Sequence, residues 1–331
     1  MGKYYLGVDV GSVSTDMALI DPFGNLIEKI YLRTKGQPIE VIKRGLKKLK
    51  ENYGSIKVAG VGTTGSGRKL AGVMLGADVI KNEITAHAVA ATHLVPDART
   101  VLEIGGQDSK IIILKDGIAV DFAMNTVCAA GTGSFLDQQA ARLGISIGEF
   151  SRLALKARSP VRIAGRCSVF AESDMIHKQQ LGHDLPEIVA GLCEAMVRNY
   201  LNNVAKGKDI KPPVVFQGGV AANIGIKKAF EKELHTEIYV PEHNGVMGAI
   251  GAALLAMEEV RSRKKETSFK GFEVTEFKFK TTSFECKGCP NRCEIVNINQ
   301  DGKTIARWGS KCLKWDMTED KKKEEVNLNP S

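Results

Sequence analysis

The feature that most constrains the fold is a pattern that occurs twice in the chain. Each copy is an apolar strand that ends in an acid, followed by a glycine-containing turn and a β-hairpin. The first copy is YYLGVDVGSVSTDMALIDPFGN, and the second is TVLEIGGQDSKIIILKDGIAVDFAMN with its hairpin turn at Lys115-Asp116-Gly117. Because helical segments follow both copies, the repeat predicts an α/β protein with two lobes of the same design.

The rest of the chain is expected to form a linker and a small cysteine-bearing end. A glycine- and alanine-rich helix at about 245–260 closes the second half, and its small residues would let it pack back on the first lobe. The segment after it is charged and has no clear period. We expect a first lobe over 1–97, a second lobe over 98–260, a linker over 261–282, a cysteine module over 283–316 and a polar tail over 317–331.

Composition excludes several classes of protein. With 331 residues, 43% of them hydrophobic, the chain can form two domains, each with its own core. The sequence shows no signal peptide and no run of about 18 apolar residues, which predicts a cytoplasmic protein without a membrane partner. Part of the net charge of +8 lies in runs at 261–266 and 320–325. No aromatic residues interleave with these runs, so we expect solvated segments and no nucleic-acid site.

Three glycine turns are candidates for a nucleotide site. Asp9 precedes the turn of residues 11–15, and Glu103 precedes the turn of residues 105–108. In each, backbone amides can cradle phosphate oxygens while the acid holds Mg²⁺ through water. One such turn alone is more typical of an ordinary loop, but two facing loops could grip the phosphates from both sides. The turn at 217–221 follows a strand and precedes a helix, which suits either a nucleoside or close helix–strand packing.

Two cysteines occupy similar contexts in the second half. Cys128 precedes a glycine turn and a helical segment, and Cys167 precedes another helix, with Ser168 as the expected N-cap. A helix N-terminus gives a thiol more thiolate character. Two cysteines cannot complete a four-thiolate cluster, whereas a two-fold dimer would supply four. The alternative from spacing alone is that both are small buried residues.

The motifs together resemble a known family. The paired phosphate loops with their hairpins are similar to the actin, Hsp70 and sugar-kinase (ASKHA) superfamily over residues 1–258, which implies duplicated βββαβα cores. The words NxxCAAGTGxFLD, CSVFAES, VGSxST, EIGGQD, GGVAxN and NGxxGAxGAA resemble the BadF/BadG/BcrA/BcrD-type ATPases. That family includes the activators of 2-hydroxyacyl-CoA dehydratases, the ATPase subunits of benzoyl-CoA reductase and the reductases of double-cubane-cluster proteins.

The resemblance implies an activity. The chain would be an ATPase that delivers single electrons from one [4Fe-4S] cluster, bridging a homodimer through Cys128 and Cys167 of each subunit. ATP hydrolysis would change the angle between the two helices that follow these cysteines and so alter the cluster's exposure and potential. The acceptor would be an iron–sulfur protein, either a dehydratase or a double-cubane-cluster protein, and the donor would be ferredoxin or flavodoxin.

The resemblance also implies roles for individual residues. Arg68 is expected to steady either the phosphates or the fold, and Cys193 matches no ligand position and is expected in the core. The catalytic group would be Asp9 and Glu103, which place Mg²⁺ and water, with Gln107 beside them. The cofactor-binding group would be Gly11, Ser12, Ser14, Thr15, Gly105 and Gly106 at the phosphates, and Gly218, Gly219 and Asn223 at the nucleoside.

A cysteine module follows the part that resembles the family. Its four cysteines are Cys286, Cys289, Cys293 and Cys312, with 2, 3 and 18 residues between them. They flank a predicted hairpin with Asp301-Gly302 at its turn. So short a module has little apolar core, which predicts a metal site. Four thiolates suit Zn²⁺ or a second iron–sulfur cluster, and the paired-knuckle spacing favours Zn²⁺. The short activators end before this point, so the module leaves the acceptor open.

Two other functions fit parts of the sequence. A small-molecule kinase of the same superfamily would use identical phosphate loops but would need a sugar or acid pocket with a catalytic aspartate. An ATP-dependent sensor or chaperone would move its lobes without transferring electrons. Bound iron would exclude the kinase. ATP hydrolysis that depends on a reductant and an acceptor would exclude the sensor.

Overall fold

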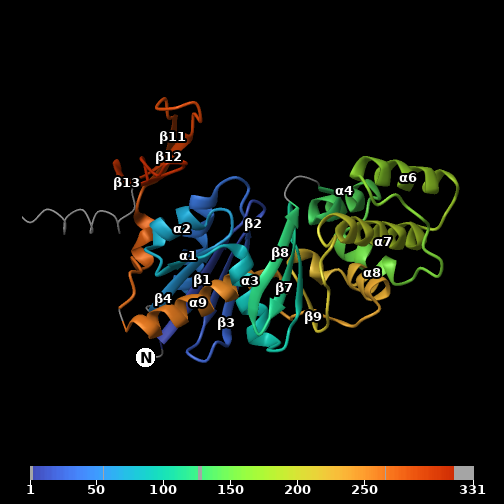
Figure 1. Ribbon diagram of the computed structural model, residues 1–331, viewed down its shortest axis with the longest axis horizontal. Helices are drawn as coiled ribbons and strands as arrows, with labels where there is room; N and C mark the ends of the chain where they lie inside the picture. The colour runs from blue at the N-terminus through green and yellow to red at the C-terminus, as the bar shows by residue number, and fades with distance from the viewer. Residues whose placement is uncertain (1–2, 55, 126–128, 265, 317–331) are drawn as a thin grey trace, which may run out of the picture.

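The computed structural model describes residues 3–54, 56–125, 129–264 and 266–316, and Cys128 lies outside them. The described chain forms two five-stranded sheets, each covered by helices, and one three-stranded sheet (Figure 1). The strands are β1 (Lys3–Val10), β2 (Ser14–Ile20), β3 (Leu26–Arg33), β4 (Lys57–Thr64), β5 (Val79–Ile80), β6 (Thr100–Ile104), β7 (Ser109–Lys115), β8 (Ile118–Asn125), β9 (Val214–Gln217), β10 (Ile238–Tyr239), β11 (Phe279–Glu285), β12 (Glu294–Gln300) and β13 (Lys303–Trp308). The α-helices are α1 (Pro38–Tyr53), α2 (Arg68–Leu75), α3 (Glu83–Leu94), α4 (Gly133–Arg142), α5 (Ile147–Ala154), α6 (Ser168–Gln180), α7 (Leu185–Asn203), α8 (Ile224–Leu234) and α9 (Met247–Arg263).

The two large sheets repeat one topology. Their strand orders are β3-β2-β1-β4-β5 and β8-β7-β6-β9-β10, so β1 corresponds to β6 and the other strands follow in step. In both, the acid-bearing strand is central, antiparallel to the next strand of the hairpin and parallel to the strand on its other side. The duplicated α/β core predicted from the sequence is therefore present.

Helices α3 and α9 lie between the two sheets. Helix α9 packs on β1, β2 and β4 of the first sheet, while α3 packs on α9 and on the second sheet (Figure 1). The approach is close because glycine is present at the contacts: a Cβ at Gly7 would overlap the carbonyl oxygen of Ala249, and one at Gly251 would overlap that of Ala86. The glycine- and alanine-rich closing helix thus covers the first lobe.

The segment interpreted as a linker is packed against the first lobe. Phe272 and Val274 are buried in its core. Asp78 anchors the start of the segment, because its carboxylate accepts hydrogen bonds from the Thr267 hydroxyl at 2.6 Å and the Ser268 amide at 2.8 Å. Sparse apolar residues among charges, which give no periodic signal in the sequence, hold this segment in place.

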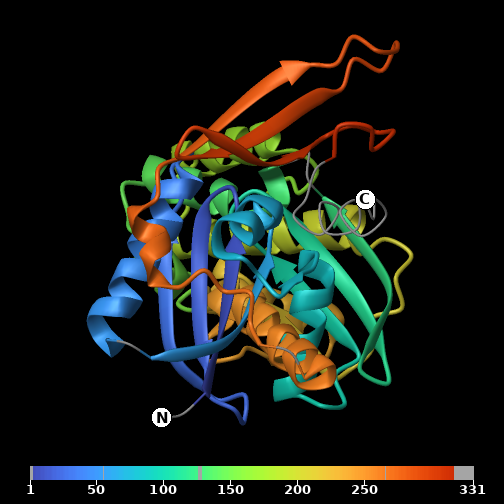
Figure 2. The ribbon, with the colours of Figure 1, turned by 90° about the vertical axis from the view of Figure 1, so that its left-hand side faces the viewer.

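The third sheet projects beyond the two lobes (Figure 2). Its strands β11, β12 and β13 are antiparallel, and Asp301 and Gly302 form the tight turn between the last two with φ angles of 50° and 83°. The loop that carries Cys286, Cys289 and Cys293 joins β11 to β12, and the segment that carries Cys312 follows β13, so the cysteines lie at one end of the sheet and the Asp301-Gly302 turn at the other. No helix in the described ranges is long and apolar enough to cross a membrane.

Candidate functional site

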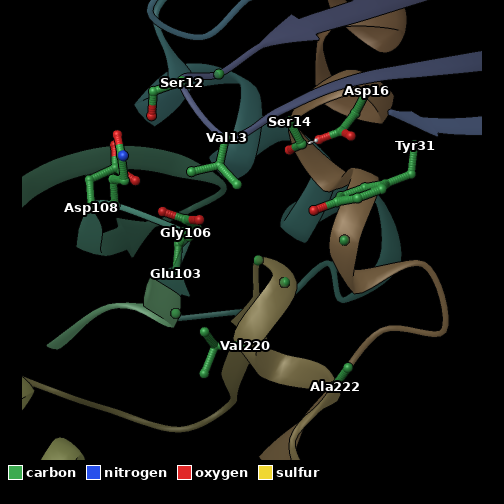
Figure 3. A pocket seen from close by; sticks show the side chains of 18 of the residues that line it. Ser12, Val13, Ser14, Asp16, Tyr31, Glu103, Gly106, Asp108, Val220 and Ala222 are labelled. Carbon is green, nitrogen blue, oxygen red and sulfur yellow. Dashed lines mark hydrogen bonds between the residues drawn. The ribbon is translucent and has the colours of Figure 1, made fainter. Parts of the chain in front are cut away.

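A cavity of about 410 Å³ lies between the two lobes. The ends of the acid-bearing strands β1 and β6, with their turns, and the turn after β9 line this cavity (Figure 3). They meet there because the corresponding strand ends of the two lobes face each other. Thr15 does not line the cavity; it is fully buried, and its hydroxyl lies 3.0 Å from that of Thr34. All the other residues predicted for the nucleotide do line it: Asp9, Gly11, Ser12, Ser14, Glu103, Gly105, Gly106, Gln107, Gly218, Gly219 and Asn223.

The first phosphate loop is fixed by its own backbone. The Gly11 amide donates to the Ser14 carbonyl at 2.8 Å, and the Thr34 hydroxyl donates to the Gly11 carbonyl at 3.0 Å. These bonds hold the turn while Ser12 and Val13 face the cavity (Figure 3). Such a turn presents amides toward an anion without further rearrangement.

The second phosphate loop is fastened to a helix. The amides of Gly133 and Ser134, the first two residues of α4, donate to the carbonyls of Gly105 and Gly106, both at 2.9 Å. The Ser134 hydroxyl adds a third bond, 2.5 Å from the Gly106 oxygen. Helix α4 is the helix that follows Cys128 in the chain. Three hydrogen bonds therefore hold the second loop to the first turn of α4.

Asp9 lies at the floor of the cavity. A Cβ at Gly248 would overlap one of its carboxylate oxygens and would lie 3.4 Å from His87 Nε2, so glycine makes room for both groups. Burial raises the pKa of Asp9 to about 6, although His87 and Lys110 act to lower it. The carboxylate is thus poised to accept a cation.

His87 connects the two lobes, and it was not among the residues predicted for the site. It is buried on α3, and its Nδ1 lies 2.7 Å from Gln217 Oε1 at the end of β9. Its other ring nitrogen faces the space beside Asp9. A histidine alone in an alanine-rich helix carries no motif, so only the packing of α3 between the sheets reveals it.

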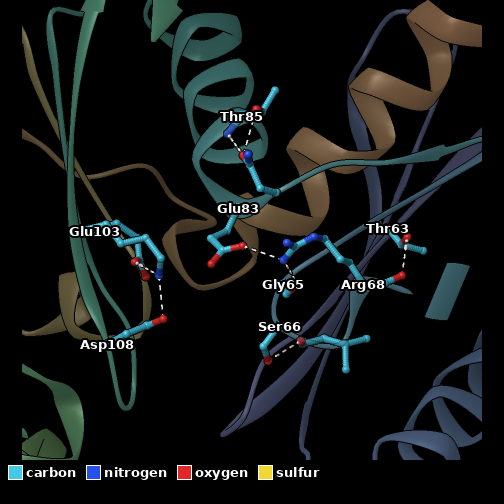
Figure 4. A network of polar contacts seen from close by, with 11 residues as sticks. Thr63, Gly65, Ser66, Arg68, Glu83, Thr85, Glu103 and Asp108 are labelled. Atoms are coloured by element: carbon cyan, nitrogen blue, oxygen red, sulfur yellow. Dashed lines mark hydrogen bonds and ion pairs between the residues drawn. The ribbon is translucent and has the colours of Figure 1, made fainter. Parts of the chain in front are cut away.

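Lys110 is a second site residue that sequence reasoning missed. Its Nζ lies 2.9 Å from both Glu103 Oε2 and Asp108 Oδ2, with 5% of the side chain exposed (Figure 4). Burial alone would lower the pKa of this ammonium, but the two carboxylates raise it above its ordinary value. The acid of the second loop is therefore neutralised from within the chain. Lys110 stands two residues after Asp108, and only the pairing of β6 with β7 shows that it is opposite Glu103.

Arg68 lies beside the cavity (Figure 4). Its Nη1 donates to the Gly65 carbonyl at 2.9 Å and to Glu83 Oε2 at 3.3 Å. The guanidinium thereby joins the start of α2 to the start of α3. Of the two roles expected for this residue, these contacts match support of the fold.

Cys167 is partly exposed and is itself the N-cap of α6. Ser168, expected as the cap, is the first residue of the helix instead, because the backbone of Cys167 is still extended. Helices α4 and α6 are joined by Glu172, which accepts from Arg142 at 2.6 Å and from Gln138 at 3.2 Å. Both helices next to the predicted cluster ligands are thus tied together.

The remaining cysteines differ sharply in environment. Cys193 is buried in the second-lobe core, and burial raises its pKa to about 12. Cys286 is half-buried and accepts from Trp315 Nε1 at 3.2 Å, whereas Cys289 and Cys312 are exposed. Within the described ranges no group of three or more His, Cys, Asp or Glu side chains is arranged to hold a metal ion.

Comparison with known proteins identifies the family. Residues 6–256 match the BadF/BadG/BcrA/BcrD ATPase family. The chain is 32% identical over 266 residues to the 2-hydroxyisocaproyl-CoA dehydratase activator of Clostridioides difficile, covering 80% of this chain and 98% of the relative. It is 34% identical over 262 residues to the (R)-2-hydroxyglutaryl-CoA dehydratase activating ATPase of Acidaminococcus fermentans, covering 78% and 99%.

Solved structures agree with the sequence match. The structure of the Clostridium difficile activator with bound ADPNP superimposes with a TM-score of 0.72 at 31% identity, covering 79% of this chain and 97% of that one. Component A of the Acidaminococcus fermentans dehydratase gives 0.73 at 34% identity, covering 78% and 99%. The resemblance inferred from the motifs is confirmed, and the cysteine module lies beyond the family match. The chain belongs to the BadF/BadG/BcrA/BcrD ATPase family.

Proposed function

We propose that this protein couples ATP hydrolysis to the transfer of single electrons. One [4Fe-4S] cluster would bridge a homodimer, and the acceptor would be an iron–sulfur protein such as a 2-hydroxyacyl-CoA dehydratase or a double-cubane-cluster protein. Ferredoxin or flavodoxin would supply the electrons. The names of the relatives, dehydratase activators and an activating ATPase, support the activator role.

The observation that carries this proposal is the attachment of the second phosphate loop to α4. Gly105 and Gly106 would hold phosphate, and their carbonyls accept the first two amides of α4. Loss of the terminal phosphate would relax this loop and so shift α4. Because Glu172 ties α4 to α6, the shift would reach the helices after both predicted cluster ligands.

The surroundings of Cys167 suit a bridging cluster. Its position at the N-terminus of α6 favours the thiolate. The next residues, Val169 and Phe170, are 67% and 64% exposed, which leaves apolar surface beside the thiol for a second copy to cover. Cys128 and Cys167 from each subunit would complete four thiolates. The bound cluster would supply one-electron transfer.

The cavity suits hydrolysis of ATP to ADP and phosphate. Asp9 would hold Mg²⁺ and Glu103 would orient water, with Gln107 beside the terminal phosphate. Gly11, Ser12, Ser14, Gly105 and Gly106 would bind phosphates, and Gly218, Gly219 and Asn223 would line the nucleoside. Thr15, whose hydroxyl faces Thr34, would support the loop from beneath.

The cysteine module is proposed to hold Zn²⁺ or a second iron–sulfur cluster. The Cys286 amide donates to the Cys293 carbonyl at 2.8 Å, which closes a short loop between these two ligands. Hydrogen bonds from the Gly288 amide and Trp315 lower the pKa of Cys286, as a metal ligand requires. Ligation would have to draw Cys289 and Cys312 in from the surface.

Metal analysis of protein purified without oxygen tests the proposal. We expect about two iron per chain from a shared [4Fe-4S] cluster and about one zinc. About six iron would make the module a second cluster. Cys128→Ser and Cys167→Ser should lose the shared cluster and its EPR signal while ADP binding persists; Cys193→Ala, which alters a buried thiol, should keep both. Absence of iron from the wild type would contradict the proposal and favour a kinase.

A further inference from the structure

Two carboxylates face each other across the first hairpin. Asp9 on β1 and Asp16 on β2 are directly opposed in the strand register, so their side chains lie on the same face of the sheet. Both line the cavity. Figure 3 shows Asp16 at the rim formed by the first lobe, between Ser14 and Tyr31.

Asp16 is not paired with a cation among the described residues. The residue is 6% exposed, and its Oδ2 accepts from the Ser14 hydroxyl at 3.1 Å. Its Oδ1 is buried and has no hydrogen-bond partner within the described ranges. No ion pair to Asp16 occurs in the part of the chain that the structure describes, and Lys110 is committed to Glu103 and Asp108. A buried oxygen without a partner in a cavity is a place for a bound group.

The second hairpin supplies the contrast. Because the lobes repeat one topology, the pair Asp9 and Asp16 corresponds to the pair Glu103 and Lys110, which are likewise directly opposed in register. In the second lobe the strand acid faces a built-in ammonium. In the first lobe the strand acid faces another acid, and among the described residues neither of these two carboxylates forms an ion pair with a Lys or Arg; His87 Nε2 is the chain group beside Asp9.

Two carboxylates side by side in a cavity, Asp16 buried and Asp9 half-buried, disfavour each other's ionised form. Burial and then Asp9 raise the pKa of Asp16 well above its ordinary value. Either a proton or a metal ion can relieve this repulsion. Mg²⁺ is commonly held by one or two carboxylates together with substrate phosphates and water, and both phosphate loops open into the same cavity.

We propose that Asp16 is a second carboxylate ligand, beside Asp9, for the divalent cation that accompanies the nucleotide. The inference rests on the proposed nucleotide site. It makes the first lobe's half of that site dependent on a metal ion for its charge balance, whereas the second lobe's half is complete without one.

Mn²⁺ binding to the full-length protein in the presence of ADP, followed by EPR of free Mn²⁺, tests this inference. Asp16→Asn should weaken Mn²⁺ binding by at least about tenfold, since even outer-shell partners of a metal site are worth that much. ADP binding in EDTA should be no weaker than in the wild type, because the substitution removes a negative charge beside the phosphates. Tyr31→Phe, which alters the cavity neighbour opposite Asp16 on β3, should leave both affinities unchanged.

The outcomes separate the two proposals. Equal Mn²⁺ affinity in wild type and Asp16→Asn would overturn the ligand role and indicate a protonated Asp16, while the nucleotide site would stand. Failure of the wild type to bind ADP with or without Mn²⁺ would overturn the nucleotide site and the inference together. The thermal unfolding midpoint of Asp16→Asn shows whether it is folded, and Asp16→Ser provides a second variant without a carboxylate.

Discussion

The two predicted phosphate loops share a topology, but the acid at the end of each strand faces a different kind of side chain. Glu103 is paired with Lys110, and its loop is bonded to α4. Asp9 faces Asp16, and its loop is bonded within the first lobe, to Ser14 and Thr34. If both proposals hold, the two loops would have different tasks: the first would depend on an external cation, and the second would transmit changes at the phosphates to the helices beside the predicted cluster ligands.

Removing the internal cation should have the largest effect. Lys110→Met leaves Glu103 and Asp108 without a partner, and breaking a buried ion pair costs about 3–5 kcal/mol. Urea unfolding measures the loss. Lys208→Met is the control, because the pair of Lys208 with Asp121 lies at the surface, where solvent screens it, and its loss should cost far less. If the two variants lost equal free energy of unfolding, the Lys110 pair would be no more important than a surface ion pair, which would contradict its role in the second loop.

The unpaired acid of the first loop should make stability depend on pH. The pKa of Asp9 is about 6 in the folded protein and 3.8 as the ordinary value, so the folded state binds more protons between these values. Without metal, stability contributed by Asp9 is therefore lost as the pH rises from about 4 to 6, by about 3 kcal/mol in all. Asp9→Asn should remove this pH dependence. Urea unfolding of the wild type and the variant in EDTA across this pH range measures it as the difference between their free energies of unfolding. Parallel pH profiles would contradict the assignment.

Replacing Asp16 by lysine, so that the first hairpin has an acid–lysine pair like the second, should reduce the dependence of ADP binding on Mg²⁺. Asp16→Lys would place an ammonium opposite Asp9, as Lys110 stands opposite Glu103. ADP should then bind about as well in EDTA as in Mg²⁺, whereas in the wild type we expect Mg²⁺ to strengthen binding by about tenfold. Calorimetric titration in the two buffers measures the ratio. An unchanged Mg²⁺ dependence would show that the two hairpins are not equivalent in charge balance.

Loosening the attachment of α4 should have the smallest effect on stability. Ser134→Ala removes one hydrogen bond to Gly106 and leaves the backbone bonds, at a cost of about 1 kcal/mol. The nucleotide dependence of any cluster signal should nevertheless weaken. Ser173→Ala, which removes a similar bond to Val169 within α6, is the matched control. Equal responses would argue against transmission through the second loop.

Local patterns in the sequence were sufficient for the lobes and the loops. Apolar strands, tight turns and paired acids are encoded over a few consecutive residues, so Asp9, Glu103 and the glycines could be located. The roles of Lys110 and Asp16 could not be predicted, because only the strand register shows that they lie opposite Glu103 and Asp9. The alternation of side chains along β2 also explains why Asp16 lines the cavity while Thr15 points into the core.

Long-range packing accounts for what the sequence could not reveal. His87 reaches the site because α3 is held between the sheets, and this arrangement depends on contacts with α9 at the far end of the chain. The segment around Phe272 and Val274 has the composition of a charged linker, yet these buried side chains and the hydrogen bonds to Asp78 hold it on the first lobe. Neither relation leaves a periodic signal in its own segment.

The most direct test of the central claim is the rate at which an iron chelator removes iron from the reduced, anaerobic protein with Mg²⁺-ATP, with Mg²⁺-ADP and without nucleotide. Coupling of the second phosphate loop to α4 and α6 predicts different rates with ATP and ADP, because the nucleotide would change the exposure of a cluster at Cys128 and Cys167. Identical rates in all three conditions, or no iron to remove, would contradict the account.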